Sequence, residues 1–288
     1  LKKVDSEYVV LLNDDTVPDS NWLRYLVDAS EHSPSIGACQ PKLKSFKTPN
    51  YFEYSGACGG MLDVYGTPFC RGRVFELVEE DRGQYDTIAE VFWSSGAAMF
   101  LRTKAIHETG LLDEMLYAHM EEIDLSWRMR LLGYHVICVP QSVVYHVGGS
   151  TWAHRPLEEQ LYLKHRNNLI VMLKNYATPN LIRFFIERLF LDAGLLIYSL
   201  AKGDGKKTTC VLKAYSWMLQ NFRLILASRK RIQKNRRVSD SKIISAMAKK
   251  SVAIQYYLLQ RKFFSALHGL PLGLDYFMNR NTVQEHEG

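Results

Sequence analysis

Short apolar runs that end in turn residues recur through the first 150 positions of the chain. Residues 8–13 and 36–43 are rich in apolar and β-branched side chains, and 91–102 consists of two apolar halves around a glycine. Two further runs cover 135–140 and 142–147. Runs of this length with such boundaries are typical of strands, and we predict that 8–13 is a short buried strand.

Segments with helical spacing alternate with these strands. Residues 19–33 place apolar side chains on one face, after Asp19 or Ser20 as the helix N-cap. Residues 103–110 and 121–134 are further predicted helices, each closed by a glycine near its end. Alternating strands and helices indicate an α/β fold for this part of the chain.

Residues 45–90 interrupt the alternation. They are rich in glycine, aromatic and charged residues and show little periodicity. We predict a long functional loop, because loops of this length in compact domains tend to carry function. Glycines within 55–66 would permit a close backbone approach to a ligand, or would simply form a flexible turn.

Helical patterns with broad apolar faces dominate from residue 156 to 262. The most apolar stretch, 181–201, contains four charged residues, so we do not predict that it crosses a membrane. Residues 222–237 form a basic amphipathic segment, and another helix is predicted to begin at Ser239 or Asp240. The last ten residues are expected to be frayed.

Charge divides the chain into two parts. The net charge is +6, but residues 1–154 contain 13 Lys and Arg against 21 Asp and Glu, whereas residues 155–288 contain 23 against 9. An acidic part favours a cation site, and a basic part favours an anionic partner. The five cysteines are widely spread and lack CxxC spacing, which favours reduced thiols in a cytoplasmic setting over disulfides or a zinc site.

Carboxylates gather where the first predicted strand ends, at Asn13, Asp14 and Asp15. Open α/β folds bind ligands at the carboxyl ends of parallel strands, and carboxylates there can hold Mg²⁺ or Mn²⁺ that bridges a diphosphate. The alternative is a plain turn, because Asp and Asn start turns through their own side chains and Pro18 follows.

A second acidic cluster, Glu121, Glu122 and Asp124, begins the predicted helix 121–134. These residues could stabilise the helix dipole, with Asp124 and Arg128 as an i,i+4 ion pair. Alternatively, repulsion between the adjacent carboxylates would raise the pKa of one of them and make it a general base near neutral pH.

Two further motifs contain candidate ligands. His146 follows a β-branched run and precedes two glycines; such a histidine is usually structural, and becomes a ligand only if the fold brings it near Asp15. Lys164, His165 and Arg166 lie on a predicted helix, where they could neutralise a leaving phosphate or form a solvated face.

In combination and order, these motifs resemble family 2 inverting glycosyltransferases of the GT-A fold. The sequences LLNDDT, SSGAAMFLR, EEIDLSWRMRLLGY, VVYHVGG and HRNNL follow one another between residues 11 and 169. The resemblance covers about residues 5–175 and is greatest to bacterial, rhamnosyltransferase-like members that build cell-surface polysaccharide. It implies an incomplete GT-A domain over 1–154 and a helical, basic carboxyl-terminal extension over 155–288.

The resemblance also implies roles for individual residues. The D-x-D motif of the family falls on residues 13–15, which makes Asp15 a metal ligand, and its catalytic base falls on Glu122, oriented by Glu121. The remaining implied roles are metal binding by His146, donor binding by Asn13, Asp14, Lys164 and Arg166, and acceptor binding by Gly96, Asp124 and Trp127.

The implied reaction moves a sugar from a nucleotide-diphosphate donor to a saccharide or lipid-linked acceptor, with inversion and with help from Mg²⁺ or Mn²⁺. No nucleic acid partner is implied. The basic segment 222–237 beside the apolar segment 181–201 suits the anionic inner face of the cell membrane, and a solvated helical subdomain is the alternative. We therefore expect a cytoplasmic protein that is peripheral to the membrane.

Family members carry a nucleotide-binding part before the D-x-D strand. One βαβ unit needs about 30 residues, and seven residues precede Tyr8 in this sequence. We therefore expect an amino-terminally truncated domain that transfers sugar poorly, with an exposed sheet edge at residues 8–13.

Two other classes of protein fit parts of the sequence. A non-catalytic scaffold or nucleic-acid-binding protein could use the basic run 228–237, but no aromatic residues interleave it for stacking, and the acidic part stays unexplained. A metal-dependent nucleotidyltransferase would need acids for two metals, and product analysis would distinguish it. The sequence does not identify the sugar, the nucleotide or the acceptor.

Overall fold

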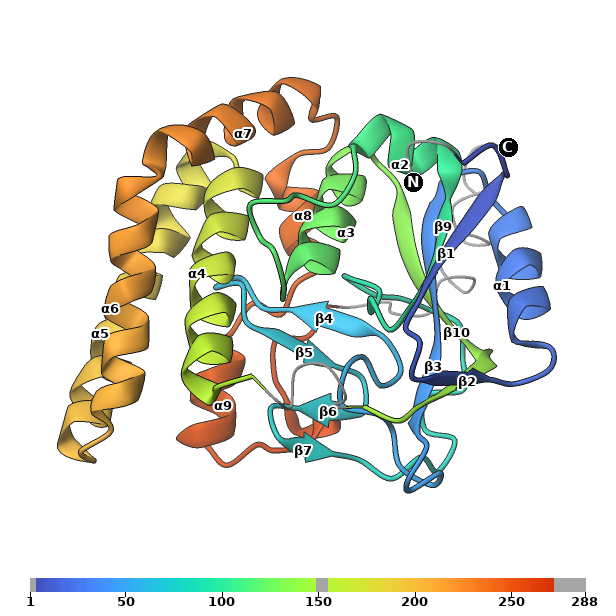
Figure 1. Cartoon of the computed structure of the whole chain (residues 1–288), viewed down its shortest axis with the longest axis horizontal. Helices are drawn as coiled ribbons and strands as arrows, with labels where there is room; N and C mark the ends of the chain where they lie inside the picture. The colour runs from blue at the N-terminus through green and yellow to red at the C-terminus, as the bar shows by residue number, and fades with distance from the viewer. Residues whose placement is uncertain (1–3, 149–154, 272–288) are drawn as a thin grey trace.

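The computed structural model describes residues 4–148 and 155–271, and its main feature is a mixed six-stranded sheet with helices on its flanks (Figure 1). The strands run in the order β1–β9–β3–β10–β2, and β8 also pairs with β10. Of these pairings, β3 with β10 is parallel and the others are antiparallel. The strand bounds are β1 Tyr8–Leu12, β2 Thr16–Pro18, β3 Ile36–Ser45, β8 Ala89–Glu90, β9 Ala98–Arg102 and β10 His135–His146.

Strand β1 lies at an edge of this sheet, paired with β9. It was predicted to be buried, but its first four residues are half-buried and Leu12 is exposed. An edge strand has a neighbour on one side, so its backbone and side chains keep contact with solvent. The prediction of a strand here is confirmed, and the prediction of its burial is wrong.

Strand β10 joins two segments that were predicted as separate strands. It pairs with β3 at both ends, and the register shifts between Val139 and Val143. Pro140 lies within this shift, and proline cannot donate a hydrogen bond to a neighbouring strand. The irregularity bends one continuous strand, which carries His146 to its carboxyl end.

Three helices flank this sheet: α1 Trp22–Glu31, α2 Thr103–Thr109 and α3 Glu121–Leu131. The N-cap of α1 is Asn21, because the carboxylate of Asp19 accepts a hydrogen bond from the Ser20 amide instead of from the helix. Gly110 ends α2 with a φ of 86°, and Gly133 follows the end of α3 with a φ of 94°, both in the left-handed region that glycine tolerates. The predicted glycine stops are thus confirmed.

Residues 45–90 are not the predicted long loop. They contain a second, antiparallel sheet in the order β4–β5–β6–β7, and residues 57–64 are buried. Gly60 permits the packing, since a Cβ there would lie 2.1 Å from the ring of Trp93. The bounds of these strands are β4 Gly60–Leu62, β5 Pro68–Cys70, β6 Arg73–Val74 and β7 Leu77–Val78.

The remainder of the described chain is helical, as predicted. Figure 1 shows α4 beside α3 and the second sheet, with α5 and α6 farther out and α7 across one end. No helix in the described ranges is long and apolar enough to cross a membrane. The predicted frayed end lies outside the described residues. The bounds are α4 Leu157–Asn175, α5 Thr178–Ala201, α6 Gly205–Gln220, α7 Phe222–Asn235, α8 Asp240–Ser245 and α9 Val252–Tyr257, followed by a 3₁₀ turn at Phe264–Ala266.

One hydrophobic core joins the helical region to the α/β part. Trp127 of α3 is fully buried between Phe92 and Tyr176, with ring centroids 5.4 Å and 4.8 Å away. Tyr176 directly follows α4, and its hydroxyl donates to the carbonyl of Val64 at 2.8 Å. The five cysteines are free and buried.

Candidate active site

The end of β1 and the end of β10 bring Asp15 and His146 into contact. Thr16 of β2 pairs with His146, so the turn after β1 lies against the last residue of β10. His146 Nε2 is 3.0 Å from Asp15 Oδ1 and 3.5 Å from the side-chain amide of Asn13. The condition that the sequence set for His146, proximity to Asp15, is therefore met.

Glu53 completes this cluster from the other side of the imidazole. Its Oε2 lies 3.3 Å from His146 Nδ1, and both side chains are buried. Burial opposes a positive charge on His146, but the carboxylates of Glu53 and Asp15 outweigh it and raise the pKa of the histidine. Glu53 was not identified from the sequence. It lies in a segment without periodicity, whose strands are too short to produce a recognisable pattern in the sequence.

The donor atoms at this cluster suit part of a metal site. Oxygen of Asp15 and nitrogen of His146 are ligands that Mn²⁺ accepts, and Mg²⁺ and Mn²⁺ at nucleotide sites take few protein ligands because substrate phosphates supply others. Within residues 4–148 and 155–271, no group of three or more His, Cys, Asp or Glu side chains is arranged to hold a metal ion. Asp15 and His146 stay predicted metal ligands.

Glu121 and Glu122 lie together in the first turn of α3, where the sequence predicted a general base. One carboxylate oxygen of each is buried without a hydrogen-bond partner among the described residues. Burial, and then the charge of Glu121, raises the pKa of Glu122 to about 8; burial also raises the pKa of Glu121. A carboxyl group of this kind can take up a proton near neutral pH.

The backbone that precedes these acids is strained. Tyr117, His119 and Met120 have φ values of 60°, 65° and 73°, in the left-handed region that non-glycine residues rarely adopt. Strain of this kind persists where the surroundings enforce it, and it concentrates at functional sites.

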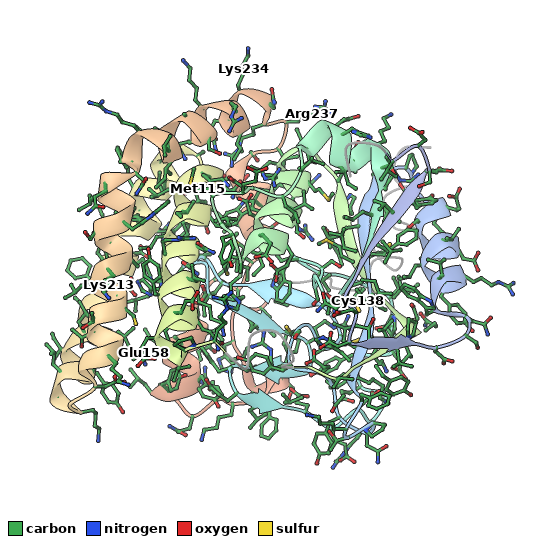
Figure 2. All side chains as sticks on the ribbon, viewed as in Figure 1. Met115, Cys138, Glu158, Lys213, Lys234 and Arg237 are labelled. Atoms are coloured by element: carbon green, nitrogen blue, oxygen red, sulfur yellow. The ribbon has the colours of Figure 1, made fainter. Side chains whose placement is uncertain are left out.

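Helix α4 supplies that enforcement. The side-chain amide of Asn167 donates to the carbonyls of Leu116, Ala118 and His119 at 2.7–2.8 Å. Arg166 donates to the carbonyls of Leu116 and of Met115, a residue labelled in Figure 2. The guanidinium of Arg166 is thus used to hold the loop before α3, and we do not carry Arg166 forward as a donor ligand. Asn167 was not identified from the sequence as a residue of the site.

Lys164 lies near other cations. The residue is exposed, but desolvation of its amino group lowers its pKa, and the charge of Arg73 lowers it further. Burial and then the charge of Lys164 lower the pKa of His119 to about 4. The amino group of Lys164 is therefore within electrostatic range of Arg73 and His119, and also of the carboxylate of Glu76, which raises its pKa.

Cys70 links the two acidic clusters. Burial is the main reason that the pKa of this thiol is raised, and the charges of Glu53 and Glu122 raise it further. Cys70 is the last residue of β5, so Glu53 and Glu122 both lie within electrostatic range of the same end of the small sheet. The convergence of Glu122 and the His146 cluster on one cleft stays a prediction.

Of the three residues to which the resemblance assigns acceptor binding, Asp124 and Trp127 are buried and Gly96 is half-buried. Asp124 is fully buried and bonds to Arg128 at 2.8 Å and Lys174 at 3.1 Å, which confirms the predicted i,i+4 pair. Neither Asp124 nor Trp127 has surface to offer an acceptor, so we leave both out of the proposal below. Gly96 lies in a turn, half-buried, with open space where a side chain would point.

Asn13 and Asp14 are exposed in a turn. The Thr16 hydroxyl donates to the Asn13 carbonyl at 2.7 Å, and the Asn13 amide donates to the Ala97 carbonyl at 3.0 Å. The turn that was the plain alternative for this segment is therefore present, and Asp15 contacts His146 from within it. Asn13 and Asp14 stay predicted donor ligands.

The fold and these clusters define an α/β domain with paired carboxylates at a helix start and a strand-end acid beside a histidine. A family model described as "Glycosyltransferase like family 2" matches residues 1–159. This match covers more than half of the chain, which therefore belongs to that family. The predicted fold class, a GT-A type α/β domain followed by a helical region, is confirmed.

Two curated relatives come from two strains of Mycobacterium tuberculosis, and both are named N-acetylglucosaminyl-diphospho-decaprenol L-rhamnosyltransferase. Each is 25% identical over 182 residues, which is 59% of this chain and 56% of the relative. The chain thus spans about half the length of these relatives. A solved structure of GalNAc-T7 with UDP, GalNAc and Mn²⁺ covers 60% of this chain and 32% of its own, with a TM-score of 0.43 and 15% identity.

Proposed function

We propose that the protein transfers a sugar from a nucleotide-diphosphate donor to a saccharide or lipid-linked acceptor, with inversion at the anomeric carbon. Membership of the family supports sugar transfer. The observation that carries the mechanism is Glu122: a carboxyl group at a helix start, with a buried oxygen that has no partner in the described ranges and a pKa raised to about 8. Such a group costs stability, and general base chemistry explains its presence.

The reaction is a single displacement. Glu122 removes the proton from an acceptor hydroxyl, and the oxygen forms a bond to the anomeric carbon. The bond from that carbon to the phosphate oxygen breaks on the opposite face, and the nucleotide diphosphate leaves with the electron pair. Glu121 keeps the pKa of Glu122 high, so the proton is held by Glu122 after transfer.

Positive charge is needed where the diphosphate departs. Lys164 lies within electrostatic range of Arg73 and of Glu76, and we keep it as the candidate that contacts the diphosphate. A divalent metal held by Asp15 and His146 would supply further charge neutralisation on the diphosphate when bound. Asn13 and Asp14, exposed in the same turn as Asp15, are available to a donor molecule.

A lipid-linked acceptor is favoured by the relatives, whose names state a diphospho-decaprenol acceptor and rhamnosyl transfer. We extend the class of acceptor to this protein, and leave the sugar open. Analysis of the products tests the reaction class: a glycosylated acceptor with a free nucleotide diphosphate supports the proposal, and transfer of the nucleotide itself contradicts it.

Glu122→Gln tests the role of the base in a form of the protein that shows transfer before mutation. A glutamine keeps the shape of the side chain but cannot take the proton, so kcat is expected to fall about 10²–10⁴-fold. Donor affinity, measured by calorimetry, is expected to stay unchanged. Glu121→Gln is the matched comparison: it keeps the base, so turnover is expected to persist with a shifted pH dependence. Near-full activity of the Glu122 variant would contradict the assignment of Glu122 as the general base.

A further inference from the structure

The outward face of α5 is apolar along its length. Its members are between 43% and 74% exposed: Ile182, Ile186, Leu189, Phe190, Ile197 and Leu200. They recur three, four or seven residues apart, apart from the adjacent Leu189 and Phe190, and so lie on one side of the helix. Single exposed apolar residues are ordinary, but a continuous stripe marks an interaction surface.

Two charged residues of the same helix, Arg188 and Asp192, point inward, whereas Arg183 and Glu187 pair with each other at the surface at 3.2 Å. Asp192 is buried and accepts hydrogen bonds from Arg188 at 2.9 Å and from the Tyr215 hydroxyl at 2.7 Å. Arg188 also donates to Asn168 of α4 at 2.9 Å. A typical surface helix has the opposite arrangement. These bonds fix the rotation of α5, so the apolar stripe has to face away from the protein.

Exposed cations outnumber exposed acids on α5, α6 and α7. Between residues 178 and 237, all of which the structure describes, the acids with exposed side chains are Asp204 and Glu187, and Glu187 is paired with Arg183. Exposed cations in this range include Lys202, Lys206 and Lys213 next to α5 or on α6, and Lys230, Arg231 and Lys234 on α7. Figure 2 shows Lys213 and Lys234 on the outer side of α6 and α7. Helices α5 to α7 therefore present an excess of positive charge, of which Lys206 is paired with Glu158 of α4 at 2.6 Å.

We propose that the outward stripe of α5 and the cations of α6 and α7 dock on an anionic lipid surface. Helix α5 has 24 residues and would lie parallel to the bilayer, with its apolar side chains at the boundary between headgroups and acyl chains. The lysines and arginines would contact lipid phosphates. This partner deepens the proposed function, because a lipid-linked acceptor resides in a bilayer.

A second copy of the chain is the other occupant to consider. Two α5 stripes packed on each other would bring the cations of both copies together, with few exposed acids in each segment to offset them. Like charges in close contact are destabilising. An anionic bilayer supplies the complementary charge, so the observations favour lipid.

Co-sedimentation with phosphatidylcholine vesicles, with and without phosphatidylglycerol, tests the proposal. The native chain is expected to bind vesicles that contain phosphatidylglycerol. Phe190→Ser with Ile197→Ser is expected to weaken binding by at least about tenfold, since burial of one large apolar side chain is worth about that factor. Leu23→Ser is the control: Leu23 is 43% exposed on α1, outside this surface, and its replacement is expected to leave binding unchanged.

The same assay separates the outcomes. Replacing Lys202, Lys206 and Lys213 by Gln is expected to weaken binding to vesicles that contain phosphatidylglycerol, and to leave binding to pure phosphatidylcholine vesicles unchanged. The proposal would be overturned if the native chain did not bind vesicles, or if it bound them no better than the double variant of Phe190 and Ile197. It would also be overturned if the native chain formed a dimer in sedimentation equilibrium and the double variant did not. Vesicle binding needs no turnover, so a chain that binds lipid without transferring sugar overturns the proposed function only.

Discussion

The first turn of α3 and the middle of α5 both contain buried carboxylates, but the surroundings raise the pKa of one and lower the pKa of the other. On α5, burial alone would raise the pKa of Asp192, but His165, Arg188 and Tyr215 hold it at about 2. On α3, burial raises the pKa of Glu122 to about 8 and the neighbouring Glu121 adds to the effect. A compensated carboxylate supports the fold, whereas an uncompensated one costs stability and is retained for chemistry.

Substitution of Asp192 is the strongest test of this contrast between α3 and α5. In Asp192→Ala, Arg188 and His165 lose their buried partner, and the free energy of unfolding is expected to fall by about 3–5 kcal/mol. Urea unfolding followed by circular dichroism measures this. Asp28→Ala is the control, because its pair with Arg24 is exposed and worth at most about 1 kcal/mol. Equal losses in the two variants would mean that the buried bonds of Asp192 stabilise the fold no more than an exposed ion pair does.

Local signals in the sequence predicted much of this architecture. The ion pair of Asp124 and Arg128 follows from i,i+4 spacing on a helix, and the stops at Gly110 and Gly133 follow from the conformation that glycine alone adopts easily. The strands of 45–90 were missed, because β4 to β7 have two or three residues each and show no alternation. Contacts distant in sequence, such as Gly60 against Trp93, hold them in place.

Candidate site residues were predictable where a motif ends an element. Asp15 and His146 follow strands, and the fold brings these strand ends together. Glu53 and Asn167 had no such signal, because each acts through contacts made at least 48 positions away. The sequence also showed charges within the apolar segment 181–201, but the period of the helix alone does not say that Arg188 and Asp192 face inward.

An effect of opposite sign to the loss at Asp192 is expected at Glu122. A carboxyl group whose folded pKa is raised binds a proton that the unfolded chain has released. The contribution of Glu122 to stability is therefore fully present below pH 4.5 and is lost as the pH rises through 8. Glu122→Gln removes this loss, so the variant is expected to be more stable than the native chain at pH 9, by at most about 5 kcal/mol.

Thermal unfolding of both chains at pH 4 and pH 9 checks this. The two melting temperatures are expected to coincide at pH 4 and to separate at pH 9, with the variant higher. A variant that is less stable than the native chain at pH 9 would show that Glu122 has a stabilising partner, and the contrast with Asp192 would then fail.

The smallest expected effect is a shift in pH dependence caused by Glu121. The base must be ionised to accept a proton, so kcat/KM should rise with pH and level off above the pKa of Glu122, which is about 8. The charge of Glu121 is the second cause of that pKa, after burial. Glu121→Gln should therefore move the rising limb to lower pH without removing it, because burial persists. An unmoved limb would mean that the two carboxylates titrate independently, whereas a limb that disappears would assign the base to Glu121.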